Sequence, residues 1–197
     1  MDPVVLLAMV DRCAVPEVPR TIVYAVALAE SGGHRFVIRD NTTKTVHRFH
    51  GINAALVFMK TYPSHSLDIG LMQVNTRAHR VDPGDISPCQ NIRIGSEILV
   101  RDTHGEGTEF TQKALCLYHT GKQGPCRTYL ERVESFLHKQ KRKESVLQMS
   151  DRKNEVQEGN PVVMTEGEGR GPLDAEWIIP SIRESTVDVG LMRASMQ

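Results

Sequence analysis

The stretch Ile22-Val-Tyr-Ala-Val-Ala-Leu-Ala-Glu-Ser-Gly-Gly33 decides how the chain folds. It follows Pro19, is almost entirely apolar up to Ala29 and ends in two glycines. A proline before a helix and a glycine after it are common start and stop signals. We therefore expect an apolar helix over residues 20–31, at the centre of a compact, mainly helical domain.

Helical patterns recur on both sides of this stretch. They cover residues 3–13, 90–103, 110–119 and 126–139. In the last segment the apolar residues follow the stripe of an amphipathic helix. Asn53 is expected to cap one further helix, over residues 54–62, which Pro63 ends.

One β element is expected among these helices. Residues 34–40 and 44–49 flank Asn41-Thr-Thr43 and have the pattern of two short strands joined by a turn. The predicted fold class is therefore α+β, mainly helical, with one small β-hairpin.

Composition divides the chain near residue 138. Trp177 is the single aromatic residue after that position, and residues 139–197 are charged and poor in large apolar groups. Such a segment cannot bury enough surface to offset the entropy lost on ordering. We expect a folded domain over residues 1–138 and a charged, disordered tail over residues 139–197.

The charges of the chain balance, with 24 Lys and Arg against 24 Asp and Glu and a pI near 7.1. A neutral chain has no general field that would hold nucleic acid or an anionic membrane. No apolar run reaches the roughly 18 residues of a membrane-spanning helix, and the first residues lack the basic region of a secretory signal. The expectation is no nucleic-acid partner, no transmembrane segment and no visible export signal.

Glu30 is the acidic residue that follows the apolar run, in the last turn of the predicted helix. Apolar neighbours and the negative end of the helix dipole both favour the neutral form of such a carboxyl group. A carboxyl group that keeps its proton near neutral pH suits a general acid. From position alone, the alternative is a helix-terminal glutamate that points into water.

The segment Ser66-Leu-Asp-Ile-Gly-Leu-Met-Gln-Val-Asn75 alternates apolar residues with amides near its end. One face could pack while Gln73 and Asn75 present hydrogen-bonding groups to a polar ligand. Gly70 would let the backbone approach that ligand closely. The alternative is a buried turn in which the amides satisfy backbone groups.

Tyr118 and His119 stand at a predicted helix end, just before Gly121. The phenol could donate a hydrogen bond to a carboxylate or to a sugar oxygen. The alternative is a half-buried tyrosine with its hydroxyl in solvent.

Other chemistries lack a motif. The eight histidines show no HxxxH or HExxH spacing, and no GxSxG elbow or nucleotide-binding glycine loop is present. We expect no metal site and no cofactor. The four cysteines, Cys13, Cys89, Cys116 and Cys126, allow two disulfides by any of three connectivities, or stay free thiols.

Three segments, taken in order, resemble the motifs of the soluble lytic transglycosylase (SLT-like) family. They are Glu30-Ser-Gly-Gly33, Gly70-Leu-Met-Gln-Val-Asn75 and Tyr118-His-Thr-Gly121. Further likeness to the small transglycosylases of conjugation and type IV secretion systems lies at Cys13-Ala14, Ile38-Arg-Asp-Asn41, Asp68-Ile-Gly-Leu-Met-Gln73 and Pro88-Cys-Gln-Asn-Ile92. The resemblance covers roughly residues 5–135.

This resemblance implies a lysozyme-like fold and a carbon-oxygen lyase activity. The family cleaves the MurNAc-β-1,4-GlcNAc bond of peptidoglycan and leaves a 1,6-anhydro-MurNAc product. By residue matching, Glu30 would act as both acid and base, without the second carboxylate that most glycosidases use. The residues that would contact substrate or line its cleft are Ser66, Met72, Gln73, Asn75, Tyr118 and His119.

The resemblance also carries expectations about setting. It implies a periplasmic or cell-envelope location, peptidoglycan strands as the partner, and secretion or conjugation channel components as possible partners of the tail. An envelope location makes disulfides expected. The segments that match the family favour the pair Cys13–Cys89, and Cys116 is expected to pair with Cys126 because the two bracket one turn between two helices.

One residue departs from the family pattern, because the third motif usually reads Tyr-Asn-x-Gly and position 119 here is histidine. This change could weaken activity or make binding pH-sensitive. Two alternatives to the transglycosylase therefore stay open. One is a lysozyme-type muramidase, and the other is a non-catalytic peptidoglycan-binding module of a secretion apparatus.

Overall fold

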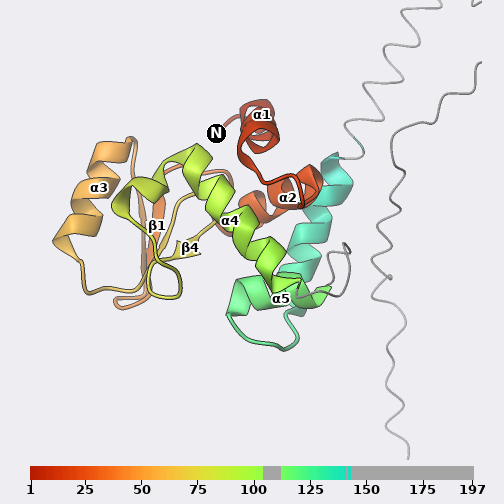
Figure 1. The fold of residues 1–197 in the computed structure, drawn as a ribbon. Helices are drawn as coiled ribbons and strands as arrows, with labels where there is room; N and C mark the ends of the chain where they lie inside the picture. The colour runs from red at the N-terminus through yellow and green to blue at the C-terminus, as the bar shows by residue number, and fades with distance from the viewer. Residues whose placement is uncertain (104–111, 141, 143–197) are drawn as a thin grey trace, which may run out of the picture. The chain divides into compact units, whose positions relative to one another are not determined.

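The computed structural model describes residues 1–103, 112–140 and 142 (Figure 1). Its elements are α1 (Pro3–Cys13), α2 (Arg20–Ser31), β1 (Val37–Asp40), β2 (Thr45–Arg48), α3 (Ile52–Thr61), β3 (Leu67–Ile69), β4 (Val74–Asn75), the 3₁₀ helix η1 (Pro83–Ile86), α4 (Pro88–Asp102), α5 (Gln112–Thr120) and a last helix over residues 127–140. The expected α+β, mainly helical class is confirmed. Most of the expected disordered tail lies outside the described residues.

Helix α2 forms as the sequence predicts, and most of its residues are buried. It starts after Pro19 and ends at Gly32, which adopts a left-handed conformation and donates its N–H to the Leu28 carbonyl. The larger core cluster joins α2 to apolar residues of α1, α4, α5 and the last helix. Glu30 is therefore carried by the helix that the rest of this core surrounds.

A four-stranded antiparallel sheet stands beside these helices, in the order β2-β1-β3-β4. The hairpin of β1 and β2 is confirmed, with Asp40 paired to Thr45 next to the turn. The sequence interpretation missed β3 and β4. These strands have three and two residues, which is too short to show the alternation of a strand.

Helix α3 covers the far side of the sheet (Figure 1) and shares a second, smaller core cluster with it. The predicted cap was wrong by two positions, since Gly51 and not Asn53 precedes the helix. Ile52 packs against the second cluster and so belongs to the first turn. Asn53 is left exposed within that turn.

Both expected disulfides are present. Cys13 is bonded to Cys89 and joins the end of α1 to the start of α4. Cys116 is bonded to Cys126 and joins α5 to the segment before the last helix. Each bridge therefore fixes a helix of the larger core.

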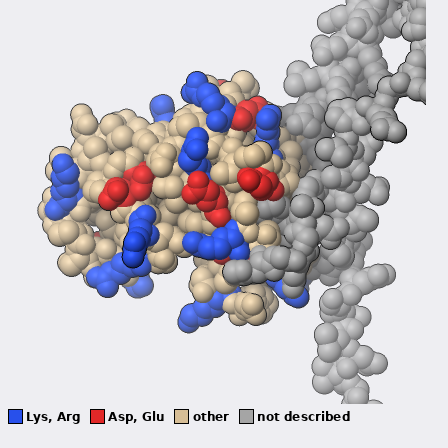
Figure 2. Space-filling model, in the orientation of Figure 1, with Lys and Arg blue, Asp and Glu red and all other residues tan. Residues whose placement is uncertain are grey.

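Charges are mixed on the surface. On the face shown in Figure 2, Lys and Arg side chains alternate with Asp and Glu over the described residues. This agrees with the balanced composition of the chain. Within the described residues, every helix is too short or too polar to span a bilayer.

Gly70 forms the turn between β3 and β4, with a φ of +73°. A Cβ atom at this position would lie 2.6 Å from the side chain of Asn91, which is fully buried in α4. Asn91 accepts a hydrogen bond from the Met72 N–H (2.8 Å) and donates one to the Ile69 carbonyl (3.0 Å). Helix α4 thus fixes the turn through a single amide.

We expect Gly70→Ala to lower the free energy of unfolding by about 2–5 kcal/mol. An alanine in the left-handed region costs about 1–2 kcal/mol, and displacing Asn91 adds an overpacking cost of about 1–3 kcal/mol. Urea unfolding measures the loss. Gly84→Ala is the control, because Gly84 has a negative φ and open space around it. Equal losses in the two variants would contradict this account of the turn.

Candidate active site

A cavity of about 550 Å³ opens between the sheet and the helices of the larger core. Its lining comes from the end of α2, from β1, β3 and β4, from the end of α5 and from the last helix. Five of the residues that the sequence singled out line it: Glu30, Gln73, Asn75, Tyr118 and His119. Segments far apart in the sequence are therefore brought together at one site.

The carboxylate of Glu30 lies at this cavity with only 13% of its side chain exposed. Its Oε1 atom is buried and has no hydrogen-bond partner among the described residues. Buried polar atoms without a partner are uncommon, and a catalytic role is one of the accepted reasons for them. The alternative of a glutamate that points into bulk water is not what the geometry shows.

Two phenols flank Glu30. Tyr118 donates a hydrogen bond to the Met72 carbonyl (2.7 Å), and burial together with the Glu30 carboxylate raises the pKa of Tyr118. Tyr129 is 3% exposed, and its hydroxyl is buried close to the Glu30 carboxylate. Burial, followed by the charge of Glu30, raises the pKa of Tyr129 well above its ordinary value. Both phenols therefore stay protonated beside the carboxylate.

Tyr129 is a site residue that the sequence interpretation missed. It falls on the apolar stripe of the last helix, so the pattern assigned it to packing. Its ring does pack in the larger core. Only the three-dimensional structure shows that its hydroxyl lies close to Glu30.

His119 contacts Glu30 directly, with 3.4 Å between His119 Nδ1 and Glu30 Oε1. The imidazole is stacked on the ring of Tyr129, with 3.9 Å between ring centroids and 6° between the planes. Its side chain is 40% exposed at the cavity. The histidine that replaces the family asparagine is thus held between a phenol and the candidate acid.

The amides of Gln73 and Asn75 both line the cavity and satisfy other groups. Gln73 donates to the carbonyls of Gly70 (2.9 Å) and Val37 (3.3 Å). Asn75 donates to Asp68 Oδ1 (2.6 Å) and accepts from two backbone N–H groups that follow it. The two amides therefore satisfy backbone and side-chain groups of the turn, as the second interpretation expected, and they also lie at the cavity.

Met72 does not line the cavity, contrary to the sequence-based expectation. Its side chain is fully buried and packs into the space that Gly95 leaves on α4. A Cβ atom at Gly95 would lie 2.5 Å from Met72. The tight turn at Gly70 sends this side chain toward α4, so only the Met72 carbonyl faces the site, through Tyr118.

Ser66 also lies outside the cavity lining. Its hydroxyl accepts a hydrogen bond from the side-chain amide of Asn75 (3.2 Å), and its carbonyl accepts one from the N–H of Asn41 (2.8 Å). Ser66 therefore holds the lining residues Asn75 and Asn41 in place by hydrogen bonds and is not placed to contact a ligand in the cavity.

Six further charged or polar residues line the cavity without having been singled out as site residues. They are Arg39, Asn41, Asp68, His79, Thr120 and Arg132. Burial and the nearby Arg101 cation lower the pKa of His79, which favours its neutral form. Strand alternation places Arg39 on the face opposite to the buried Ile38 and Asp40, a signal that could have identified it.

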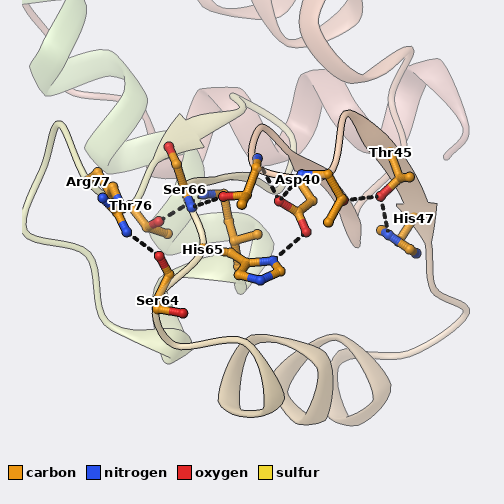
Figure 3. A network of polar contacts seen from close by, with 11 residues as sticks. Asp40, Thr45, His47, Ser64, His65, Ser66, Thr76 and Arg77 are labelled. Atoms are coloured by element: carbon orange, nitrogen blue, oxygen red, sulfur yellow. Dashed lines mark hydrogen bonds and ion pairs between the residues drawn. The ribbon is translucent and has the colours of Figure 1, made fainter.

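A polar network surrounds Asp40 (Figure 3), which directly precedes the cavity-lining residue Asn41. Asp40 is 2% exposed and accepts hydrogen bonds from the N–H groups of Thr42 (2.8 Å) and Thr43 (3.2 Å) and from His65 Nδ1 (2.6 Å). Burial alone would raise the pKa of Asp40. The hydrogen bonds from His65, Thr43 and Thr42 outweigh it and hold that pKa well below its usual range.

The low pKa of Asp40 predicts a pH dependence of stability. A carboxyl group whose pKa is lower in the folded state stabilises the fold above its unfolded-state pKa, about 3.9, and loses this contribution as the pH falls further. We expect the stability difference between wild type and Asp40→Asn to shrink as the pH falls below about 4. Thermal unfolding above and below this pH measures the difference. A difference independent of pH would contradict the prediction, and Asp11→Asn, an exposed site, is the control.

No cluster of three or more potential metal ligands occurs in residues 1–103, 112–140 and 142. Two phenols and an imidazole surround the Glu30 carboxyl group, and groups of these kinds are suited to proton transfer.

The chain is similar to proteins named virB1. It is 31% identical over 137 residues to those of Agrobacterium fabrum (strain C58), Rhizobium radiobacter and Agrobacterium tumefaciens (strain 15955). The aligned part is 63% of this chain and 56–57% of the relatives, so the chain spans little more than half of their length. The chain is homologous to virB1 over this part. No family model matches it, and no solved structure does.

Proposed function

We propose that this chain is a peptidoglycan lytic transglycosylase that cleaves the MurNAc-β-1,4-GlcNAc bond. The observation that carries the proposal is Glu30, a single carboxylate that is nearly buried at a cavity and whose Oε1 lacks a hydrogen-bond partner among the described residues. The homology to virB1, together with the transglycosylase motifs in the sequence, supports the same class.

The first step is general acid catalysis by Glu30. Its carboxyl group donates a proton to the glycosidic oxygen while the bond from C1 of MurNAc to that oxygen breaks. The 2-acetamido group of the same sugar supports the positive charge that develops at C1. A positioned carboxyl group is a common general acid, and the last turn of α2 holds this one at the cavity.

The second step uses Glu30 as a general base. The carboxylate takes the proton of the C6 hydroxyl group, whose oxygen bonds to C1 and gives the 1,6-anhydro product. Glu30 ends with the proton that it started with, so the cycle needs no water and no second carboxylate. Asp68 is accordingly free to serve as the partner of Asn75.

His119 acts on the acid and not on the sugar in this scheme. Its Nδ1 atom is 3.4 Å from Glu30, and stacking on Tyr129 limits its rotation. The family asparagine would be too short to combine both contacts. We propose that this histidine keeps the Glu30 side chain in place.

The setting follows from the substrate. Peptidoglycan places the enzyme in the periplasm or cell envelope, and homology to virB1 favours local opening of the wall for a type IV secretion or conjugation apparatus. Contacts with channel components would involve the tail, whose residues lie outside the described part of the chain.

Mass spectrometry of digested peptidoglycan tests the proposed function. Purified sacculi incubated with the protein should release anhydro-muropeptides without new reducing ends. Soluble products with new reducing ends would instead identify a lysozyme-type muramidase. Sedimentation of the protein with sacculi and no soluble product would identify a binding module.

A further inference from the structure

Arg39 is a cationic residue of the cavity to which the reaction scheme gives no role. It lies in the middle of β1, between the buried residues Ile38 and Asp40. Its side chain points away from the second core cluster, is exposed and lines the cavity. A guanidinium group is therefore presented to whatever occupies this site.

The guanidinium of Arg39 has no ion pair or side-chain hydrogen bond with any described residue. The nearest candidate is Asp68, its directly opposite neighbour on β3. Opposite charges at such positions usually attract each other. Here Asp68 accepts a short hydrogen bond from Asn75 instead, at 2.6 Å.

The other arginine of the lining contrasts with Arg39. Arg132 donates a hydrogen bond to the Ala29 carbonyl (3.3 Å) and is thereby bound to the end of α2. This hydrogen bond gives Arg132 a structural role at the end of α2. Within the part of the chain that the structure describes, Arg39 has no such contact, and its positive charge on the sheet side of the cavity has no ion-pair partner there.

The proposed substrate offers this charge a specific partner. The sugar rings of peptidoglycan carry hydroxyl and acetamido groups, which are neutral. Its carboxylates belong to the peptides attached through the lactyl group of MurNAc. Guanidinium groups bind carboxylates through two parallel hydrogen bonds, which uncharged sugars cannot offer.

We infer that Arg39 binds a carboxylate of the stem peptide and makes the enzyme prefer peptide-bearing strands over bare glycan. This inference rests on the proposed function, since it names the substrate class of the same cavity. Arg39 lies on the sheet and forms no ion pair with Glu30, so we assign it to binding and not to the proton transfers.

A comparison of two substrates distinguishes binding of a peptide carboxylate by Arg39 from a purely structural role of this residue. Native strands that carry peptides are compared with strands from which an amidase has removed the peptides and whose freed lactyl carboxylates have been converted to neutral amides by carbodiimide coupling with ammonia. We expect Arg39→Gln to lower kcat/KM about 3–10-fold on peptide-bearing strands, as expected for one charge-assisted contact, and less than about 2-fold on stripped strands. Arg39→Lys should restore part of the loss, because it keeps the charge but not the two-pronged geometry.

Arg48→Gln is the matched control, because Arg48 is an exposed strand arginine of the same sheet that does not line the cavity. It should leave both rates unchanged. The wild-type preference for peptide-bearing strands should also shrink when salt is raised, since salt screens an exposed ion pair.

Equal losses on both substrates, or no loss on either, would overturn the role of Arg39. Co-sedimentation of wild type and Arg39→Gln with the two polymers measures the same preference without catalysis. If no anhydro product forms from either substrate, the proposed function fails. The binding comparison then still decides whether Arg39 recognises peptide carboxylates.

Discussion

Glu30→Gln should release no anhydro-muropeptides from peptidoglycan while keeping its fold. Glutamine has nearly the same shape as glutamate but can neither donate the proton of the first step nor accept that of the second. Loss of a general acid and base lowers the rate by about 10²–10⁴-fold, which would put product below detection. Mass spectrometry of digested sacculi measures the products, and circular dichroism with thermal unfolding checks the fold.

The fold should persist because Glu30 contributes little to it. Its Oε1 atom has no hydrogen bond with a described residue, and its contact with His119 is 3.4 Å long. Glu97→Gln is the matched control, since Glu97 is an exposed glutamate of α4. Product release retained by Glu30→Gln would mean that another group supplies the proton.

Removal of the Cys13–Cys89 bridge should have the largest effect on stability. The two cysteines are 76 residues apart, and closing a loop of that length stabilises a fold by about 4 kcal/mol in the chain-entropy model. The bridge joins α1 to α4, both of which contribute to the core around α2. Urea unfolding of the double variant Cys13→Ala, Cys89→Ala measures the loss.

The second bridge supplies the comparison for this prediction. Cys116 and Cys126 are 10 residues apart, so the same model assigns their bridge a smaller contribution of about 2.5–3 kcal/mol. The variant Cys116→Ala, Cys126→Ala should therefore lose less stability than the first double variant. A larger loss would show that loop length does not dominate here.

Local signals predicted much of the fold. Pro19 and the pair Gly32-Gly33 bounded α2 correctly, because helix starts and stops depend on neighbouring residues. The hairpin around residues 41–43 was predicted for the same reason. The spacing of four cysteines leaves three connectivities open, so the pair Cys13–Cys89 was predicted from the family resemblance and the pair Cys116–Cys126 from its position around one turn.

The candidate site was predicted in part. Glu30, Gln73, Asn75, Tyr118 and His119 do line one cavity. The prediction that Met72 lines the cleft was wrong because the chain changes direction after Gly70, and this turn points the Met72 side chain into the core. The residues next to Met72 in the sequence do not determine that direction. Its direction depends on the space above Gly95, which lies on another helix.

The sequence by itself determined which segments become helices, where α2 ends and that its last turn carries an acid. The tertiary structure alone decided that Tyr129 and His119 enclose this acid and that Arg39 faces the same cavity unpaired. The physical reason is the sequence distance over which the interactions act. Caps, turns and periodicity act over a few residues, whereas a site forms from side chains that only packing brings within a few ångströms of one another.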